Sequence, residues 1–552
     1  MAKMTVNGIL LIYHHDLAPY ASNMFEHIRS FQENSQFKVW AVNTYLGFPK
    51  VLTEFKFQAI VLHYSLFAFT HFPLDEDFRA YLSECTSNYK VAFFQDEYHL
   101  WPERAEVINR YKIDCVYTCL EPDYYKDTYQ QYTRVPRIET YLPGYASEEM
   151  VRLAQRVSKP ESERTIDIGY RGRHNTYYLG KGAREKIEIG VRFRELAAGL
   201  GLTMDIETEE HKRIYGEQWL AFLANCRATL GVEAGSSIFD IDNVIVPQYQ
   251  KLLAKNPQIS FEEMYKRLLV KYDGKGVYYR TASPRVFEAA VVRTCQILYE
   301  GRYSRILEPM VHYIPLKKDF SNFDEVIRLY RDEEFRRELT ENCYRDLIAS
   351  GAYGYRRFIE KFDEGLVAAG MKPGISPGLV RQVTERLKEG EKAIMIKKVE
   401  GQRAEYQELM NKHVALQVQY MEQQKQFQEQ HQALQVQYSE QQKQFQEQHQ
   451  ALQVQYSKQQ KQLQLVLEQQ VALQVEYMEQ QKQLQQTMDG HQGLQVQYME
   501  QQKQLQQAMD QLQALEVQYK ELTNQYQALL AQYMNNWNLI KVVFRRIIKR
   551  GS

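Results

Sequence analysis

Short apolar runs alternate with longer polar segments over the first 120 residues. The segments between the runs, such as Tyr20–Gln32 and Pro102–Tyr111, have the length of helices. The runs show little internal alternation, the pattern of parallel strands that are buried on both faces. They are Gly8–His14, Lys38–Thr44, Ala59–Tyr64, Val91–Gln95 and Cys115–Cys119. Strands that alternate with helices predict an α/β domain with a doubly wound parallel sheet, and we expect it to occupy residues 1–150.

A second pattern of the same kind begins after the loose stretch Tyr141–Pro160, which we expect to cross between domains. Strands are predicted at Thr165–Tyr170, Cys295–Tyr299 and His312–Pro315, and Trp219–Val232 has the pattern of a helix that leads into a strand. Three amphipathic helices should follow, at Phe323–Arg331, Glu333–Ser350 and Tyr353–Leu366. We therefore expect a second Rossmann-like domain over residues 151–370, followed by a linker over 371–400.

The next part of the chain repeats itself. A motif LQVQY, LQVEY or LEVQY recurs with its leucine at Leu416, Leu434, Leu452, Leu473, Leu494 and Leu515, so the spacing is 18 residues twice and then 21 residues. Twenty-one residues are three heptads and eighteen are a heptad plus an eleven-residue unit, so both spacings keep an apolar stripe in line on a helix. The pattern predicts a coiled coil over residues 401–535 that joins two or three copies of the chain. A disordered Gln-rich tract is the alternative.

The last segment, 536–552, has a different chemistry and contains no acidic residue. On a helical wheel Trp537 and Phe544 lie in an apolar arc, and the opposite arc carries Lys541, Arg545, Arg546 and Lys549. This division is typical of an amphipathic helix that lies on an anionic membrane surface. A contact between helix ends of an oligomer is the alternative.

Composition limits the partners and the cellular compartment that we expect for the protein. The 552 residues include 69 Lys and Arg and 69 Asp and Glu, so the net charge is zero and gives no overall attraction to nucleic acid. The six cysteines have no paired CxxC spacing, and no secretory leader precedes them, so we expect reduced core cysteines in a cytoplasmic protein. Since no run of about 18 apolar residues exists, no segment is expected to span a bilayer.

Polar side chains follow the predicted strands of the first domain. His14 follows the first strand and Asp96 follows the fourth. Ligands of doubly wound sheets bind beyond the carboxyl ends of the strands, so both residues are candidates for the general base that deprotonates an acceptor hydroxyl. The alternative is that they cap the helices that come next.

In the second domain, basic residues follow the predicted strand Thr165–Tyr170. Arg171, Gly172 and Arg173 come directly after it, and Lys181 lies eight residues beyond Arg173. Glycine allows a phosphate to approach the backbone, and Arg and Lys supply charge, although such a loop is often only solvated. Further on, a helix is expected to start after Ser283 and Pro284, with Arg285 at an anion-binding end and Glu288 one turn further in, able to accept hydrogen bonds from sugar hydroxyls.

The segments PRVFEAAVVRTCQILYEG and HYIPLKKDFSNFDEVI resemble the nucleotide-sugar end of GT-B glycosyltransferases, in the group-1 branch that includes spore-maturation-type proteins. The resemblance implies a GT-B fold of two Rossmann-like domains, with Arg173 and Lys181, and Arg171 in reserve, on the donor pyrophosphate and Glu288 on the ribose. Many retaining members carry a second glutamate eight positions earlier, where this chain has Arg280, so the resemblance does not supply the stereochemistry or the donor. It implies no cofactor and no metal, and we read Asp240 and Asp242 as loop caps in spite of their DxD spacing.

These observations predict a metal-independent glycosyltransferase that acts at the inner face of the plasma membrane. A nucleotide sugar would be the donor and a surface glycan or a lipid-linked glycan the acceptor, while the coiled coil would oligomerise the enzyme and position it at an anionic membrane surface. Because Arg280 replaces a common glutamate, an inactive scaffold or sugar-binding protein that works through its coiled coil is an alternative. A nucleotide-sugar epimerase of the same fold is a third possibility.

Overall fold

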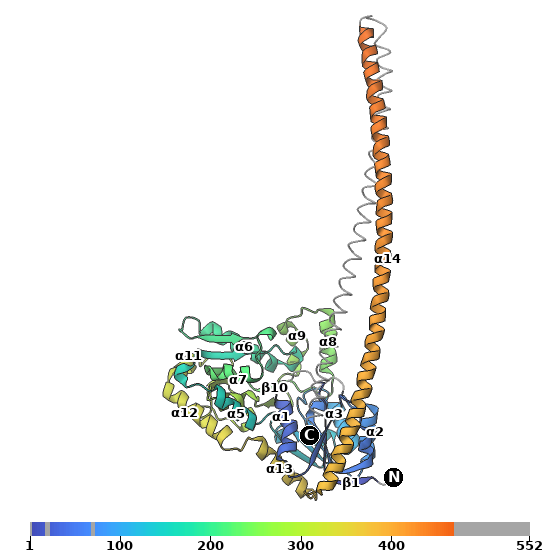
Figure 1. Cartoon of the computed structure of the whole chain (residues 1–552). Coiled ribbons are helices and arrows are strands. Elements are labelled where there is room, and N and C mark those ends of the chain that lie inside the picture. The colour runs from blue at the N-terminus through green and yellow to red at the C-terminus, as the bar shows by residue number, and fades with distance from the viewer. Residues whose placement is uncertain (1–2, 17–21, 68–71, 468–552) are drawn as a thin grey trace. The chain divides into compact units, whose positions relative to one another are not determined.

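The computed structural model describes residues 3–16, 22–67 and 72–467. The chain divides into two units, residues 1–396 and residues 397–552. The first unit contains two α/β domains (Figure 1). All of the candidate residues for chemistry lie in this unit.

The first domain is built on a six-stranded parallel sheet with the strand order β2-β1-β3-β4-β5-β6. The five strands predicted from apolar runs are β1 to β5, and β6 is an additional edge strand that the pattern did not predict. The strands are β1 (Met4–Tyr13), β2 (Val39–Asn43), β3 (Phe55–Leu62), β4 (Tyr89–Phe94), β5 (Cys115–Thr118) and β6 (Arg137–Thr140). Because the strand order reverses between β1 and β3, the ligand crevice of such a sheet is expected at the carboxyl ends of these two strands.

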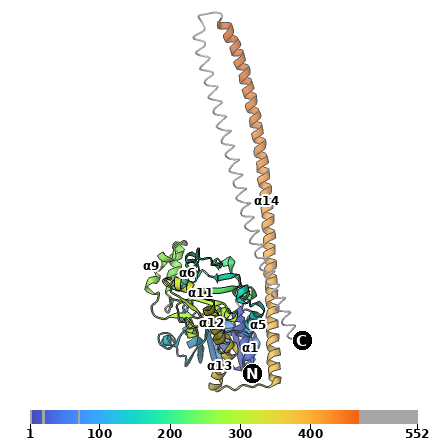
Figure 2. The ribbon, with the colours of Figure 1, turned by 90° about the vertical axis from the view of Figure 1, so that its left-hand side faces the viewer.

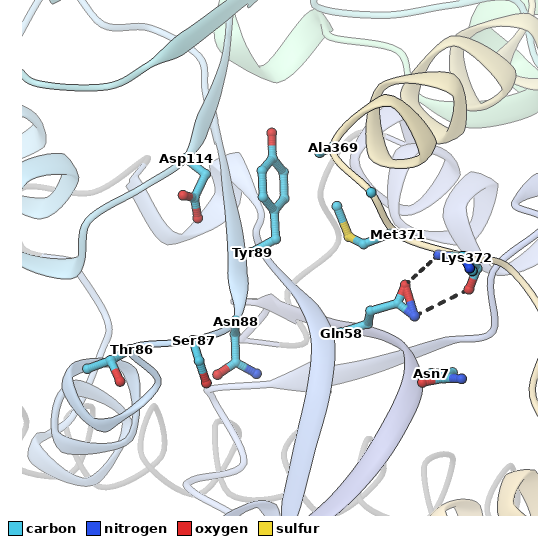
Figure 3. A pocket seen from close by; sticks show the side chains of 11 residues that line it. Asn7, Gln58, Thr86, Ser87, Asn88, Tyr89, Asp114, Ala369, Met371 and Lys372 are labelled. Atoms are coloured by element: carbon cyan, nitrogen blue, oxygen red, sulfur yellow. Dashed lines mark hydrogen bonds between the residues drawn. The ribbon is translucent and has the colours of Figure 1, made fainter.

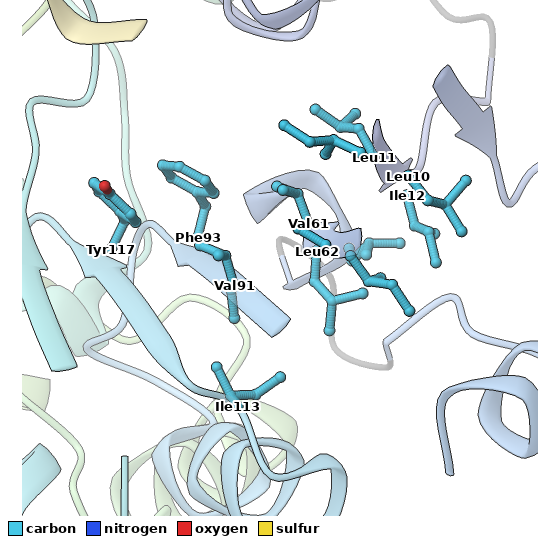
Figure 4. Packing of buried hydrophobic residues seen from close by; sticks show 14 of the residues in the cluster. Leu10, Leu11, Ile12, Val61, Leu62, Val91, Phe93, Ile113 and Tyr117 are labelled. Carbon is cyan, nitrogen blue, oxygen red and sulfur yellow. The ribbon is translucent and has the colours of Figure 1, made fainter. Parts of the chain in front are cut away.

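The core of this domain lies on both faces of the sheet. Leu10, Leu11 and Ile12 of β1 and Val61 and Leu62 of β3 are fully buried, and they pack together in the centre of the sheet (Figure 4). Burial on both faces is the reason for the apolar runs without alternation. The helices of this domain are α1 (Ser22–Asn34), α2 (Glu76–Glu84), α3 (Trp101–Tyr111) and α4 (Tyr129–Tyr132), and α5 (Glu148–Val157) follows at the crossing between domains.

The second domain has a five-stranded parallel sheet with the order β13-β12-β9-β7-β8. Its strands are β7 (Ile166–Arg171), β8 (Met204–Glu207), β9 (Cys226–Gly231), β12 (Cys295–Tyr299) and β13 (Ile314–Leu316), and β10 (Ala234–Ser236) and β11 (Tyr279–Thr281) form a separate antiparallel ribbon. Its helices are α6 (Lys181–Leu196), α7 (Gly216–Ala224), α8 (Ile245–Lys255), α9 (Phe261–Arg267), α10 (Arg285–Val291), α11 (Phe323–Arg331) and α12 (Glu333–Tyr344). The first and third strands of this sheet are again neighbours, so the expected crevice lies at the ends of β7 and β9.

The chain then returns to the first domain. Helix α13 (Tyr355–Ala368) buries Phe358, Ile359 and Phe362 in the core of the first domain. It lies beside α1 in both views (Figure 1, Figure 2), where Phe362 meets Phe31 edge to face at 5.0 Å between ring centroids. Two Rossmann-like domains with a returning C-terminal helix form the GT-B architecture, so the predicted fold class is confirmed.

The linker prediction is wrong from Pro377 onward, because residues 377–467 form one helix, α14 (Pro377–Leu467). Its first turns pack on the first domain, with Val383 and Leu387 buried in that core. Trp40 Nε1 donates a hydrogen bond to Thr384 Oγ1 at 2.9 Å, and Arg386 pairs with Glu54 at 2.7 Å. The apolar residues recur at helical spacing but are separated by charged residues, which hid the packed face in the sequence.

We expect the substitution Val383→Ala to lower the free energy of unfolding of the full chain by about 1–2.5 kcal/mol, since it removes methyl groups from a fully buried site. Val414→Ala, at a half-exposed position of the same helix, should change it by less than about 0.5 kcal/mol. Urea denaturation of both variants measures the difference. Equal effects would contradict the packing of α14 on the first domain.

In the second unit the chain is helical from residue 397 to 467, which includes the first part of the predicted coiled coil. The leucines at 473, 494 and 515 and the predicted membrane helix 536–552 lie outside the described residues. This applies to Trp537, Phe544, Lys541, Arg545, Arg546 and Lys549. Among the helices that the structure describes, none is long and apolar enough to cross a membrane.

Candidate active site

The end of β7 places two arginines of the predicted donor site in different environments. Arg171 is buried, and its guanidinium forms a bidentate ion pair with the carboxylate of Asp205 on β8, with distances of 2.8 and 2.9 Å. It also donates to the carbonyl oxygen of Lys212. These contacts join β7 to β8, so the prediction that Arg171 is a reserve donor ligand is corrected: its side chain has a structural role. Arg173, two residues further on, is exposed.

Arg173 belongs to a group of cations that come from three elements. The half-buried Lys186 of α6 lies near Arg285, Arg280 and Arg173, and burial and then these charges lower the pKa of its amino group to about 8. In the described part of the chain, Arg173, Lys186 and Arg285 form no ion pair with a carboxylate. Such a concentration of unpaired positive charge at the end of a strand can hold a diphosphate.

Arg285 begins α10 and connects this group with Glu288. Its Nη1 donates to the carbonyl oxygen of Arg171 at 2.6 Å, and its guanidinium lies 5.1 Å from the ring centroid of Trp219. Trp219 Nε1 in turn donates to Glu288 Oε2 at 2.7 Å. Burial raises the pKa of the Glu288 carboxyl, while the hydrogen bond from Trp219 and the charge of Arg285 oppose this rise. Trp219 therefore orients the carboxylate of Glu288, and the guanidinium of Arg285 lies near both side chains.

Arg280 is almost fully buried. It donates to Glu185, and its Nε lies 3.8 Å from Glu233 Oε2. Glu185 also pairs with Lys318 at 2.7 Å, and Glu233 accepts hydrogen bonds from Tyr278 and from the amides of Arg302 and Tyr303. Gly182 allows the close approach of Arg280, since a Cβ there would clash with Nη1. The guanidinium of Arg280 is thus a buried cation whose charge is neutralised by Glu185 and Glu233.

Asp96 of the first domain faces the cationic group. It follows β4 with a left-handed backbone conformation at φ 57°. Burial raises the pKa of its carboxyl group, and the charges of Lys186, Arg104 and Arg173 together with a hydrogen bond from Tyr98 oppose this rise. Asp96 is therefore close to Lys186 and Arg173, and the structure brings the predicted residues Asp96 and Arg173 of the two domains together.

His14, the other predicted base, lies at the end of β1. Its Nδ1 is 2.8 Å from Thr44 Oγ1, and its backbone N–H donates to Ser65 Oγ at 2.9 Å. Its ring meets Tyr45 edge to face. His14 is thus at the switch point of the first sheet, held by residues that follow β2 and β3.

One predicted donor residue points away from this group of cations. Lys181 is the exposed first residue of α6, and its Nζ lies 5.2 Å from the ring centroid of Tyr265 on α9. Lys186 is five residues later, about 140° around the helix at 100° per residue, so the two lysines face different ways. The basic residue beside Arg173 is therefore Lys186, which the sequence prediction missed. Ser283 Oγ accepts a hydrogen bond from the amide of Arg285 at 3.4 Å.

Asp240 caps a helix, as predicted. Its carboxylate accepts hydrogen bonds from the amides of Val244, Ile245 and Val246 at 2.8 to 3.1 Å. The carboxylate of Asp240 thus satisfies three backbone N–H groups at the start of α8. Among the described residues, no group of three or more His, Cys, Asp or Glu residues is arranged to hold a metal ion.

A cavity of about 550 Å³ lies elsewhere, at the opposite end of the first sheet (Figure 3). It is lined by residues that precede β4 and β5, including Asn88 and Asp114, and by the segment between α13 and α14. There Gln58 and the backbone of Lys372 exchange two hydrogen bonds. Because ligands of doubly wound sheets bind at the carboxyl ends of the strands, this cavity is not the candidate active site.

Comparison with known proteins gives structural matches only. No family model matches the chain, and no curated protein matches it. Solved structures that match include TarM, at 12% identity over 56% of this chain and 54% of that one, with a TM-score of 0.33. Thus the match spans about half of TarM.

Two further matches extend over whole proteins. Anabaena HepE in complex with UDP and glucose matches at 11% identity over 66% of this chain and 100% of HepE, with a TM-score of 0.35. A sucrose-phosphate synthase from Thermosynechococcus elongatus matches at 11% identity over 66% and 100% of the two chains, with a TM-score of 0.36. Similarity at this level transfers neither a ligand nor a reaction, so the chemistry of the site rests on its own residues.

Proposed function

We propose that the protein is a glycosyltransferase that moves a sugar from a nucleoside-diphosphate donor to an acceptor hydroxyl. The observation that carries this proposal is the group of unpaired cations, Arg173, Lys186 and Arg285, with Asp96 of the other domain close to it. Cations that neutralise a leaving diphosphate and a carboxylate that can accept a proton are the two functions that this transfer requires.

In the proposed reaction the bond between the sugar C1 and the diphosphate oxygen breaks, and a bond forms between C1 and the acceptor oxygen. Arg173, Lys186 and Arg285 stabilise the charge that develops on the departing diphosphate. Asp96 takes the proton of the acceptor hydroxyl, and Glu288 accepts hydrogen bonds from the ribose of the nucleotide. The raised pKa of Asp96 makes it a stronger base than an ordinary surface carboxylate.

The first test is binding of nucleotides to the full chain. We expect one of UDP, GDP and ADP to raise the melting temperature, and Glu288→Ala to weaken its binding about 5- to 20-fold, because each hydrogen bond to a charged group contributes about 1.5–3 kcal/mol and part of it is replaced by water. Arg337→Ala, at an exposed arginine on α12, is the matched control. Titration calorimetry gives the dissociation constants.

If none of the three nucleotides binds, the scaffold alternative becomes the better one. Arg280 is consistent with that alternative, since a buried, neutralised arginine stands where many retaining relatives of this class have a glutamate. Binding without hydrolysis or transfer of any nucleotide sugar would also favour a sugar-binding protein. Release of a new nucleotide sugar without an acceptor would identify an epimerase.

For the C-terminal part we propose that the repeats form a homo-oligomeric coiled coil and that residues 536–552 bind the inner face of the plasma membrane, where a lipid-linked or surface glycan would be the acceptor. The repeats at 18 and 21 residues and the separation of basic and apolar residues in the last segment support this proposal. Several weak membrane helices joined in one oligomer bind more tightly than a single helix.

Co-sedimentation with vesicles tests the membrane proposal. The full chain should pellet with vesicles that contain phosphatidylglycerol and remain in solution with purely zwitterionic vesicles. A chain that ends at residue 535 should remain in solution with both, because it lacks the basic segment. Equal pelleting of the two chains would assign the membrane contact to another part of the protein.

A further inference from the structure

The side chain of Tyr279 crosses from the second domain into the first. Tyr279 begins β11, which pairs with β10 in the second domain, but its side chain is buried in the hydrophobic core of the first domain. The next residue on the strand is Arg280, whose side chain binds Glu185 and Glu233 of the second domain. Successive residues of a strand point to opposite sides, so this short strand connects both domains beside the donor site.

The hydroxyl of Tyr279 has two partners on the loop after β4. It donates to Glu97 Oε2 at 2.5 Å and accepts a hydrogen bond from the backbone N–H of Asp96 at 2.9 Å. The other oxygen of Glu97 accepts hydrogen bonds from Thr118 and Tyr129. Since Glu97 has no exposed surface, the three hydroxyl groups replace water around a buried carboxylate.

Asp96 needs such a restraint because its backbone is in the left-handed region at φ 57°. This conformation is uncommon for residues other than glycine, although Asp adopts it more readily than most, and neighbouring groups hold it in place. Two other contacts act on the same residue. Arg104 donates to its carbonyl oxygen at 3.3 Å, and Tyr98, whose ring lies 5.4 Å from that of Tyr279, donates to its carboxylate.

We propose that Tyr279 is a positioning residue, whose hydroxyl holds Asp96 of the first domain in its strained conformation at the donor site of the second domain. The inference rests on the proposed function for the role of Asp96, but the contact itself does not. Tyr279 thereby couples the correct apposition of the two domains to the placement of the base, because the hydroxyl reaches Asp96 only when the ribbon of β10 and β11 is seated against the first domain.

The test compares Tyr279→Phe with Tyr129→Phe in the full chain. Both tyrosines are buried, and both variants remove one hydroxyl from Glu97. Only Tyr279→Phe also removes the acceptor of the Asp96 amide. A purely structural role would therefore affect the two variants alike, and a positioning role would separate them.

Hydrogen exchange is the first measurement, and it needs no substrate. We expect the peptide that contains Asp96 to exchange about tenfold faster in Tyr279→Phe than in Tyr129→Phe, while peptides of β1 and β3 exchange equally in both. Equal exchange at Asp96 in the two variants would overturn the proposal.

Kinetics is the second measurement. With the donor found in the nucleotide screen, Tyr279→Phe should lower kcat about tenfold and change the nucleotide dissociation constant by less than about twofold, whereas Tyr129→Phe should change both by less than about twofold. Equal loss of kcat in both variants would overturn the positioning role. A wild-type protein that binds a nucleotide but transfers no sugar would overturn the proposed function and the catalytic part of this inference, while the exchange result would still decide whether Tyr279 holds Asp96.

Discussion

Replacement of Lys186 by methionine is expected to weaken the binding of a nucleoside diphosphate by about 10- to 100-fold, because a hydrogen bond to a charged group contributes about 1.5–3 kcal/mol. Methionine keeps the length and most of the packing of the side chain. The substitution removes one cation from a group whose charges already repel, so the free energy of unfolding of the ligand-free protein should not fall. Titration calorimetry on the full chain measures the dissociation constant.

The pH dependence of binding identifies Lys186 independently. Burial and the neighbouring cations lower the pKa of Lys186 to about 8, so the amino group is charged at pH 7 and loses its proton as the pH rises through about 8. Nucleotide affinity should therefore fall over this range. Since a bound diphosphate raises the pKa again, binding about one pH unit above 8 should take up close to one proton, seen as a dependence of the binding enthalpy on the buffer.

Lys181→Met is the matched control for both measurements, since it removes a lysine from the same helix but from a different side. We expect its nucleotide affinity to change by less than about threefold, which is the effect of a remote surface charge. Binding by Lys186→Met should show no fall near pH 8. A larger loss in Lys181→Met than in Lys186→Met would restore the prediction from the sequence motif.

The sequence predicted the fold well because buried parallel strands leave a clear pattern. Residues Ile9–Ile12 of β1 and Ala59–Leu62 of β3 are apolar and buried at consecutive positions, and this requires cover on both faces of the sheet. Edge strand β6 escaped prediction because its residues are only partly buried. The start of α14 escaped prediction for a related reason, since Val383 and Leu387 form a narrow apolar stripe among charged residues.

The candidate site was predicted in part. The order of elements placed Asp96, Arg173 and Arg285 at the ends of strands or the start of a helix, and the structure brings them together. Lys186 could not be found in this way, because it lies inside α6 and only the rotation of that helix determines where it points. Arg171 was misjudged because a sequence motif does not show that Asp205 of the neighbouring strand binds its guanidinium.

The partners of Arg280 were also hidden from the sequence. Glu185, Glu233 and Arg280 are far apart along the chain, and each alone has the character of a surface residue. Their mutual burial shows that the charge of Arg280 is neutralised by two carboxylates within the fold.

Replacement of Asp96 by asparagine is expected to have the largest effect on the reaction, a loss of about 10²- to 10⁴-fold in kcat, which is the usual contribution of a general base. Asparagine keeps the shape of the side chain, the backbone N–H that Tyr279 binds and an oxygen that can accept the hydrogen bond of Tyr98. Nucleotide affinity should stay the same or rise slightly, since a negative charge near Arg173 and Lys186 is removed.

The dependence of the wild-type reaction rate on pH tests the roles of Asp96 and Lys186. Burial raises the pKa of Asp96, so the rate should rise with pH through a value above that of an ordinary carboxyl group as the base loses its proton. The rate at subsaturating donor should fall again near pH 8, where Lys186 becomes neutral. A bell-shaped profile results, and Asp96→Asn should lose its acidic limb while Lys186→Met loses its alkaline limb.

Release of the nucleoside diphosphate from the donor in the presence of acceptor measures kcat for both variants. The informative comparison is between turnover and binding, because an unfolded or displaced domain would lose both. If Asp96→Asn keeps its turnover, the departing diphosphate itself takes the acceptor proton, and the three cations would then be the whole of the catalytic apparatus. If turnover is lost while nucleotide binding remains, the carboxylate that the first domain brings to the cationic group is the base.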